Sequence, residues 1–341
     1  MTGNILPRVA GLAVVAMAMF GAAIPAVAQP SLDWTECTAD SESLAAADLS
    51  IAACTRAIQS RRHNGFDLAT LYANRGAQRE FRKDYTGGIE DVTKAIELDP
   101  SSADLFDTRG TLYRRLPQAD HVSAIADFTQ AIALNPKEAR YYSHRADAYS
   151  SKSAPDFDKA IADYTQAIAL DPNYAAAFGK RGATYLMITP RDFARAMSDL
   201  DRAIELDPRN PVNYGMRASA HQLPPKPDFD RAIADFTQAI LLDPSSATTF
   251  NDRGTVYVNR DPLNSTPAIA DFTQAIALDP QFADAYINRG FAYVFSAPPD
   301  FARAIADFSK AIEIDPENPE GHRLLEMAKQ AQSDPDFGKR H

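Results

Sequence analysis

The stretch AIADFTQAIALDP, residues 268–280, recurs in close copies along most of the chain. Each copy ends in a proline, and successive prolines lie 36 residues apart, at Pro100, Pro136, Pro172, Pro208, Pro244, Pro280 and Pro316. A fixed period of roughly 20 to 50 residues is typical of proteins that stack one structural unit many times. The sequence therefore predicts a repeat architecture.

Each unit predicts two helices. In the first, aromatic residues recur at Phe106, Tyr142, Phe178, Tyr214, Phe250 and Tyr286, and seven residues later stand Tyr113, Tyr149, Tyr185, His221, Tyr257 and Tyr293. A step of seven returns to the same helix face. The second helix repeats Ile269, Phe272, Ala275 and Ile276 as one apolar stripe, and the Asp-Pro that follows ends it. Strand signals are absent.

Glycines stand in the middle of the first helices, at Gly110, Gly182, Gly254 and Gly290. A glycine there costs about 1 kcal/mol relative to alanine, so it needs a structural reason. We expect close approach of the second helix, because that helix opens with a small side chain in every unit, such as Ala268.

These spacings resemble the tetratricopeptide repeat family. The resemblance rests on Phe250, Gly254 and Tyr257 in the first helix, and on Ala268, Phe272, Ala275 and Pro280 in the second. It implies an all-α, right-handed superhelical solenoid of helix-turn-helix repeats, with a concave groove lined by the first helices. Six units have 36 residues where the family usually has 34, position 88 is Gly, position 92 is Val, and His221 replaces a tyrosine.

The chain divides accordingly. We expect a signal peptide (1–28), a degenerate N-terminal half-repeat (29–66), seven units (67–100, 101–136, 137–172, 173–208, 209–244, 245–280 and 281–316), a C-terminal capping helix (317–332) and a disordered tail (333–341). The signal peptide is indicated by Arg8, an apolar run from Val9 to Phe20 and the A-x-A motif at 26–28. A transmembrane anchor is the alternative, but the run is shorter than the ~20 residues that a span needs.

Composition narrows the function further. The chain of 341 residues has a formal net charge of −10 and no cluster of Lys and Arg, which argues against binding nucleic acid or an anionic membrane surface. The only two cysteines, Cys37 and Cys54, form an isolated pair that suggests a disulfide in an exported chain. Free thiols or half of a metal site are the alternatives. This region also resembles small exported tetratricopeptide proteins of Gram-negative bacteria, which implies a periplasmic or secreted location.

Arginine and aspartate alternate in two columns. The arginines stand in the first helices, and the aspartates stand in the second helices, 18 residues after their arginines from Arg109 onward. The two columns are Arg75, Arg109, Arg145, Arg181, Arg217, Arg253 and Arg289, and Asp91, Asp127, Asp163, Asp199, Asp235, Asp271 and Asp307. A phosphate or carboxylate track is one reading. We favour a structural ladder of ion pairs, because guanidinium and carboxylate geometries match.

The implied groove has two different halves, charged toward the N-terminus and more apolar toward the C-terminus. Its predicted partner-binding residues are Asp104, Asp107, Arg114, Arg140, Asp147, Leu186, Val212, Asn251, Val258, Ile287, Phe291 and Val294. The same stripe includes Thr111, Ala176, Gln222 and Asp284. Alternatively, the C-terminal helix buries Ile287, Phe291 and Val294 through Leu324, Leu325 and Met327.

No catalytic constellation, cofactor motif or metal-ligand spacing occurs, and the six histidines share no helix face. We therefore expect a non-catalytic scaffold or adaptor that binds a protein or peptide in the groove, without cofactor or metal. The alternatives are a structural protein of the cell wall or its glycans, and a repeat-only accessory subunit of an envelope enzyme complex.

Overall fold

The computed structural model describes residues 32–39, 43–223 and 227–333, which form 17 helices and no strand. The first helices of the pairs are α3 (Gly65–Phe81), α5 (Ala103–Arg115), α7 (Ala139–Ser151), α9 (Ala175–Met187), α11 (Pro211–His221), α13 (Ala247–Arg260) and α15 (Ala283–Phe295). The second helices are α4 (Tyr85–Leu98), α6 (His121–Leu134), α8 (Phe157–Leu170), α10 (Phe193–Leu206), α12 (Phe229–Leu242), α14 (Thr266–Leu278) and α16 (Phe301–Ile314). Before them come α1 (Leu32–Cys37) and α2 (Leu44–Gln59), and after them α17 (Pro319–Ser333).

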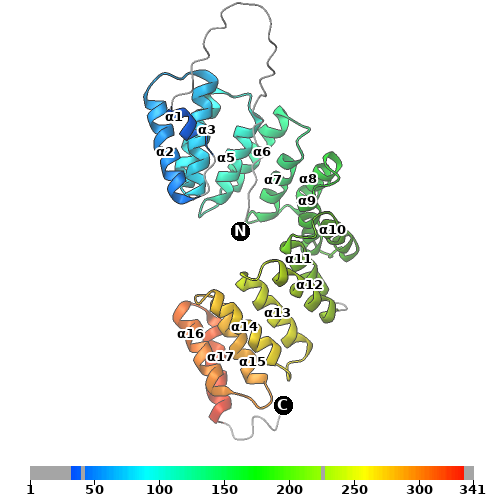
Figure 1. The fold of residues 1–341 in the computed structure, drawn as a ribbon. Helices are drawn as coiled ribbons and strands as arrows, with labels where there is room; N and C mark the ends of the chain where they lie inside the picture. Colours follow the sequence, from blue (N-terminus) through cyan, green and yellow to red (C-terminus); the bar gives the residue numbers. More distant parts are fainter. Residues whose placement is uncertain (1–31, 40–42, 224–226, 334–341) are drawn as a thin grey trace, which may run out of the picture.

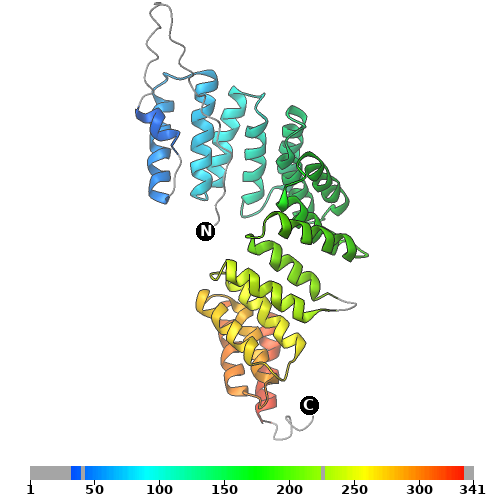
Figure 2. The same ribbon diagram turned by 45° about the vertical axis from the view of Figure 1, so that its right-hand side comes forward.

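The helix pairs stack into a right-handed superhelical solenoid. Figure 1 shows them following an arc, with α8 to α10 at the bend and the two ends of the array turned to the same side. Figure 2 shows the helix axes rotating progressively along that arc. Several first helices contact the first helix of the next pair, namely α5 with α7, α9 with α11 and α13 with α15, whereas contacts between neighbouring second helices are weaker or absent. The first helices therefore line the concave side.

Local sequence explains where the second helices begin and end. Six of them start after an aspartate whose carboxylate accepts the backbone N–H three residues on, as Asp228 does from Arg231. Such a cap stabilises a helix by about 1 kcal/mol. The helices end at the residue before Asp-Pro or Asn-Pro, because proline disfavours helical geometry in the residue that precedes it.

The core is a row of small clusters, one for each pair of helices. Each second helix buries one large side chain against its partner helix, such as Phe128, Tyr164, Leu200 and Phe236. The second helix approaches the central glycines closely, as expected, but mainly through these large side chains and not through its opening alanines. A Cβ built on Gly254 would lie 2.6 Å from Cε1 of Phe272, so the glycine makes room for that ring, and Gly110 and Gly290 face rings in the same way. At Gly182 the nearest atom is instead the carbonyl oxygen of an opening alanine, Ala196, at 3.0 Å.

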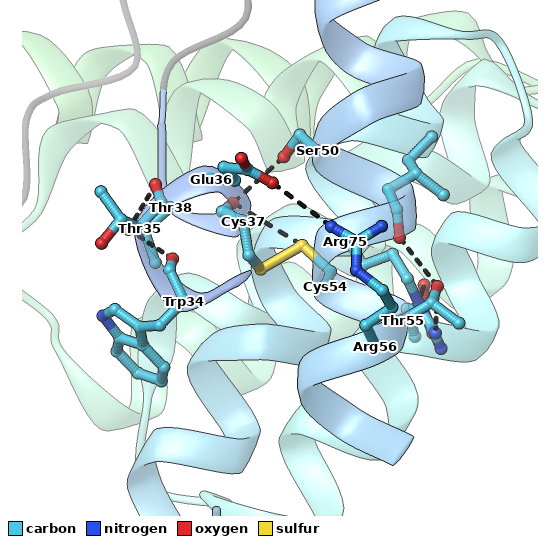
Figure 3. The surroundings of a disulfide bond; sticks show 12 residues. Trp34, Thr35, Glu36, Cys37, Thr38, Ser50, Cys54, Thr55, Arg56 and Arg75 are labelled. Atoms are coloured by element: carbon cyan, nitrogen blue, oxygen red, sulfur yellow. Dashed lines mark hydrogen bonds and ion pairs between the residues drawn. A yellow bond between two sulfur atoms is a disulfide. The ribbon is translucent and has the colours of Figure 1, made fainter. Parts of the chain in front are cut away.

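The N-terminal end of the array is held by the cysteine pair. The sulfur atoms of Cys37 and Cys54 lie at disulfide distance, 2.15 Å, and join α1 to α2 (Figure 3). Both residues are fully buried beside Leu71 of α3, and the Ser50 hydroxyl donates to the Cys37 carbonyl at 3.1 Å. Short α1 is therefore fixed against the first two long helices.

At the C-terminal end, α17 packs on α16 through Leu324 and Ala328. The predicted signal peptide, residues 1–28, and the part of the predicted tail from residue 334 onward lie outside the described residues. Within the described residues, none of the helices combines the length and apolarity that a membrane span requires.

Candidate functional site

The arginine column is joined to the aspartate column. In all seven arginines, Nε and one terminal nitrogen donate to the two oxygens of one carboxylate, at 2.6–2.8 Å. Arg181, for example, binds Asp199, one of the two carboxylates next to it in the ladder. The aspartates are buried, and the arginine side chains are at most 24% exposed.

The remaining nitrogen of each arginine reaches backward to the second helix of the preceding unit. It donates to a threonine hydroxyl in six cases, at 3.0–3.2 Å, and to Asp201 in the case of Arg217. Each guanidinium also lies over the aromatic ring three residues before it, 5.4–6.0 Å from the centroid. One arginine thus ties three helices together, and all three nitrogens of its guanidinium make contacts within the protein.

The charged half of the groove is also internally paired. Arg140 of α7 lies against the Asp104 carboxylate of α5, which also accepts from the Tyr141 hydroxyl. One turn further along, Nδ1 of His144 lies 2.7 Å from the buried Asp107. These contacts join side chains of consecutive first helices, so they stabilise the interface between units.

Asp147 is the centre of this network. Its carboxylate, only 9% exposed, accepts from Lys180 of α9 at 2.8 Å, from Arg114 of α5 at 3.2 Å and from the Tyr164 hydroxyl at 2.6 Å. Burial acts to raise the pKa of Asp147, but the two cations and the hydrogen bonds outweigh it and hold the pKa below its ordinary value. Burial and this carboxylate together raise the pKa of the Tyr164 hydroxyl.

The C-terminal half of the groove is built differently. Its inter-unit contact is neutral, because Nδ2 of Asn288 donates to Oδ1 of the buried Asn251 at 2.9 Å. Next to Asn251 stands Asp252, which is half-buried and has no ion pair within the described residues. Burial raises the pKa of Asp252, opposed by a hydrogen bond from the Asn251 side chain.

An aromatic pair is exposed at the C-terminal end of the groove. Phe291 and Phe295 are 37% and 36% exposed, with ring centroids 4.5 Å apart. Met327, 36 residues after Phe291 and therefore at the same place on α17, is 49% exposed. Ile287 and Val294 pack against the cluster that contains Leu324. The C-terminal helix thus covers Ile287 and Val294 in part and leaves Phe291 open.

The predicted groove residues therefore fall into three groups. Asp107, Asp147, Asn251 and Val258 are buried, and Arg114, Arg140, Leu186, Ile287 and Val294 are half-buried. Asp104, Val212 and Phe291 are exposed. Sequence reasoning missed His144, Lys180, Tyr164 and Asp252. Opposite charges on consecutive first helices, 33 or 37 residues apart, are a signal that would have found the first two.

The groove presents polar and aromatic side chains that are suited to non-covalent contacts. In the described ranges, no group of three or more His, Cys, Asp or Glu side chains lies where it could hold a metal ion. His221, which takes a tyrosine place, lies 3.8 Å from Asp235, and burial lowers its pKa. The groove instead offers aromatic surface, amide groups and an unpaired carboxylate.

Comparison with known proteins agrees with the repeat pattern. A family model described as TPR repeat matches residues 156–188 and 266–294, and a second, described as Tetratricopeptide repeat, matches residues 283–318. These segments, within residues 156–188 and 266–318, therefore match tetratricopeptide repeats. A search of curated protein sequences finds no match.

Solved structures share the fold. A chain of the APC/C hetero-tetramer Cut9-Hcn1 aligns with a TM-score of 0.60 and 18% identity, over 83% of this protein and 52% of that chain. A tetratricopeptide repeat protein from Parabacteroides merdae aligns with a TM-score of 0.57 and 20% identity, over 76% and 98% of the two chains. Yeast Tom70 aligns with a TM-score of 0.57 and 20% identity, over 86% of this protein and 63% of Tom70. This chain thus spans about half of the matched Cut9-Hcn1 chain, and these similarities show that it shares the helical solenoid fold of these proteins.

Proposed function

We propose that this protein is a non-catalytic scaffold or adaptor of the periplasm or the extracellular space, which binds a peptide segment or protein in its concave groove. Three features support the proposal. The solenoid presents an extended concave surface, which is the surface that such folds use for binding. The arginine ladder is occupied by structural contacts. The described residues form one continuous array of helix pairs.

The observation that carries the proposal is the stacked pair of Phe291 and Phe295. A helix needs one apolar stripe to pack, and α15 already buries Ala285, Gly290 and Ala292. The exposed rings, with Met327 at the equivalent place on α17, are surplus to that requirement. Exposed apolar clusters of this kind mark interaction sites.

The test is capture of partners from envelope extract by the purified mature protein, with protein and peptidoglycan fractions assayed separately. We expect Phe291→Ser to lose capture of the protein fraction with little change in melting temperature. Phe66→Ser is the matched control. Phe66 is 72% exposed at the start of α3, at the opposite end of the array from Phe291. This variant should retain capture.

Two results would contradict the proposal. A large fall in the melting temperature of Phe291→Ser with capture retained would assign Phe291 to the fold. Capture confined to peptidoglycan would replace the protein partner with a glycan.

The proposed location rests on the signal-like residues 1–28 and on the cysteine pair, since disulfides persist in oxidising compartments. Mass spectrometry of non-reduced protein from cells should find a mature N-terminus at Gln29 and no thiol that can be alkylated. Two alkylatable thiols would contradict an oxidising location.

A further inference from the structure

One face of helix α15 carries an acidic end and an aromatic end. Steps of four, three and four residues, which keep side chains on one side of a helix, connect Asp284, Asn288, Phe291 and Phe295. Asp284 is exposed, and the rings of Phe291 and Phe295 lie 4.5 Å apart with more than a third of each side chain exposed. A ligand that lies along α15 therefore meets a carboxylate and then an aromatic surface.

A second carboxylate is connected to this face by two hydrogen bonds. Nδ2 of Asn288 donates to Oδ1 of Asn251 on α13 at 2.9 Å, and the Asn251 side chain hydrogen-bonds the carboxylate of its neighbour Asp252. Asp252 is half-buried. These contacts join Asp252 to Asn288, which stands on α15 between Asp284 and the aromatic pair.

Neither carboxylate is neutralised by a basic residue of the next unit. On α5, Asp104 holds the place equivalent to Asp284, and it pairs with Arg140, which stands 36 residues further along. Thirty-six residues after Asp284 stands a second acid, Glu320. Within the described residues, Asp284 and Asp252 have no ion pair. The rule that pairs the acids of the N-terminal half is therefore not followed here.

The lysine and arginine side chains of the three first helices in this half are all engaged elsewhere. Helices α11, α13 and α15 have no lysine, and their arginines are Arg217, Arg253, Arg260 and Arg289. Three of these bind the aspartates of the ladder, and Arg260 pairs with Asp230 at 3.0 Å. The C-terminal half of the groove thus combines aromatic surface with negative charge that lacks a counterpart. Interfaces match such charge with the opposite sign on the partner.

We infer that the segment bound in the groove is an extended peptide with a basic side chain for Asp252 and Asp284 and, three residues away, an apolar side chain for Phe291 and Phe295. This inference deepens the proposed function and rests on it. Asp284 and Phe291 are seven helical residues apart, or about 10 Å. A peptide in the polyproline II conformation covers about 9 Å in three residues and returns to the same side. Unfolded chains already populate this conformation, so binding orders the peptide little.

The experiment measures retention of four sets of twelve-residue peptides by the purified mature protein. Each set has one fixed phenylalanine and randomised remaining positions. In three sets, the position three residues before or after the phenylalanine is arginine, citrulline or glutamate, and citrulline has nearly the shape of arginine without its charge. The fourth set places arginine seven residues away, the spacing that a helical peptide needs. We expect at least threefold greater retention of the first set than of any other, and a smaller preference at high salt.

A double variant tests the two carboxylates. Asp252→Asn with Asp284→Asn should bring the ratio of arginine to citrulline peptides close to one, while both sets still bind through the aromatic pair. The control is Asp67→Asn with Asp158→Asn, which removes the same net charge. Asp67 and Asp158 are exposed, stand like Asp284 in the first turn of a helix, and have no ion pair in the described ranges. The control should keep the threefold preference.

Equal retention of arginine and citrulline peptides by the wild-type protein would overturn the inference and leave peptide binding in the groove standing. An unchanged preference in the double variant of Asp252 and Asp284 would also overturn it. A preference for the seven-residue spacing would replace the extended peptide with a helix. Retention of none of the four sets would overturn the inference and peptide binding together.

Discussion

The two halves of the groove are built from equivalent helices, but they differ in how their acidic side chains are paired. Between α5 and α9, acidic side chains meet basic ones from the next unit, so Asp104, Asp107 and Asp147 are all partnered within the protein. Between α11 and α17, the inter-unit contact is made by two asparagines, and Asp252 and Asp284 have no ion pair among the described residues. The pKa of Asp147 lies below its ordinary value and that of Asp252 lies above it.

Beneath both halves runs the same arginine ladder, with the same geometry from Arg109 to Arg289. The comparison separates two roles within one repeat. The core and ladder positions are nearly invariant and set the stability, whereas the positions that face the groove vary and decide whether its polar groups are satisfied internally. Charge in a groove is therefore poor evidence for a ligand until its partners have been traced.

The largest expected effect concerns the ladder that both halves share. Arg181→Leu should lower the free energy of unfolding by about 3 to 5 kcal/mol, because it leaves the buried Asp199 without its bidentate partner. Chemical denaturation measures the change. Arg195→Leu is the control, since Arg195 is 70% exposed and should cost little. If Arg181→Leu unfolds like the wild type but loses its partner, the column binds ligand.

A matched pair of substitutions addresses the difference between the halves. Asp147→Asn should cost about 2 kcal/mol of stability, because Lys180 and Arg114 lose a charged acceptor. Asp252→Asn should change stability by less than about 0.5 kcal/mol or increase it, since no internal cation depends on Asp252. Equal losses in both variants would mean that Asp252 has an internal partner.

Two glycines in neighbouring first helices should respond in opposite directions. Gly215→Ala should stabilise by about 1 kcal/mol, because the added methyl group would meet no atom within 4 Å and alanine favours helix. Gly254→Ala should destabilise by about 1 kcal/mol, because its methyl group would meet the Phe272 ring. Melting temperatures would decide. A loss of stability in Gly215→Ala would show that the added methyl group meets a neighbouring group.

The smallest effect is the response to pH. The folded pKa of Asp252 is raised, so its ionised form costs stability at neutral pH and that cost disappears as the pH falls through the raised pKa. As the pH falls from 7 to 4, the free energy of unfolding of the wild-type protein should therefore rise relative to that of Asp252→Asn. The folded pKa of Asp147 is lowered, so its contribution is lost only below its ordinary value of 3.8. Urea unfolding at several pH values measures both changes. The prediction fails if the contribution of Asp147 changes at a higher pH than that of Asp252.

Much of the fold could be predicted from the sequence because the determining signals lie within one unit. The Asp-Pro pairs set the helix ends, and the alternation of Arg and Asp every 18 residues gives the pairing seen at Arg181. The close approach of the second helix to the central glycines was predicted correctly, but the pattern did not show that the nearest group at Gly254 is the Phe272 ring and not an opening alanine.

The groove could be predicted only in part, because its contacts cross from one unit to the next. Whether position 147 meets position 180 or 183 depends on the rotation between successive pairs, which no local pattern encodes. Lys180 and Tyr164 were therefore not associated with Asp147. His144 was compared with the other histidines, although its partner is an aspartate.

The backward contact of each arginine bears on how such a chain can change in length. From Arg109 onward, every arginine needs one acceptor 16 residues earlier and one 18 residues later, and five of these six units supply both with the same residue types. Gain or loss of one 36-residue block therefore leaves every remaining arginine with both of its acceptors. The groove-side pairs have no such tolerance, since removal of the block that carries Lys180 leaves Asp147 facing a different neighbour. Recombination within a gene for this protein can thus alter the reach of the solenoid readily, and it alters the order of contacts along the groove in the same event.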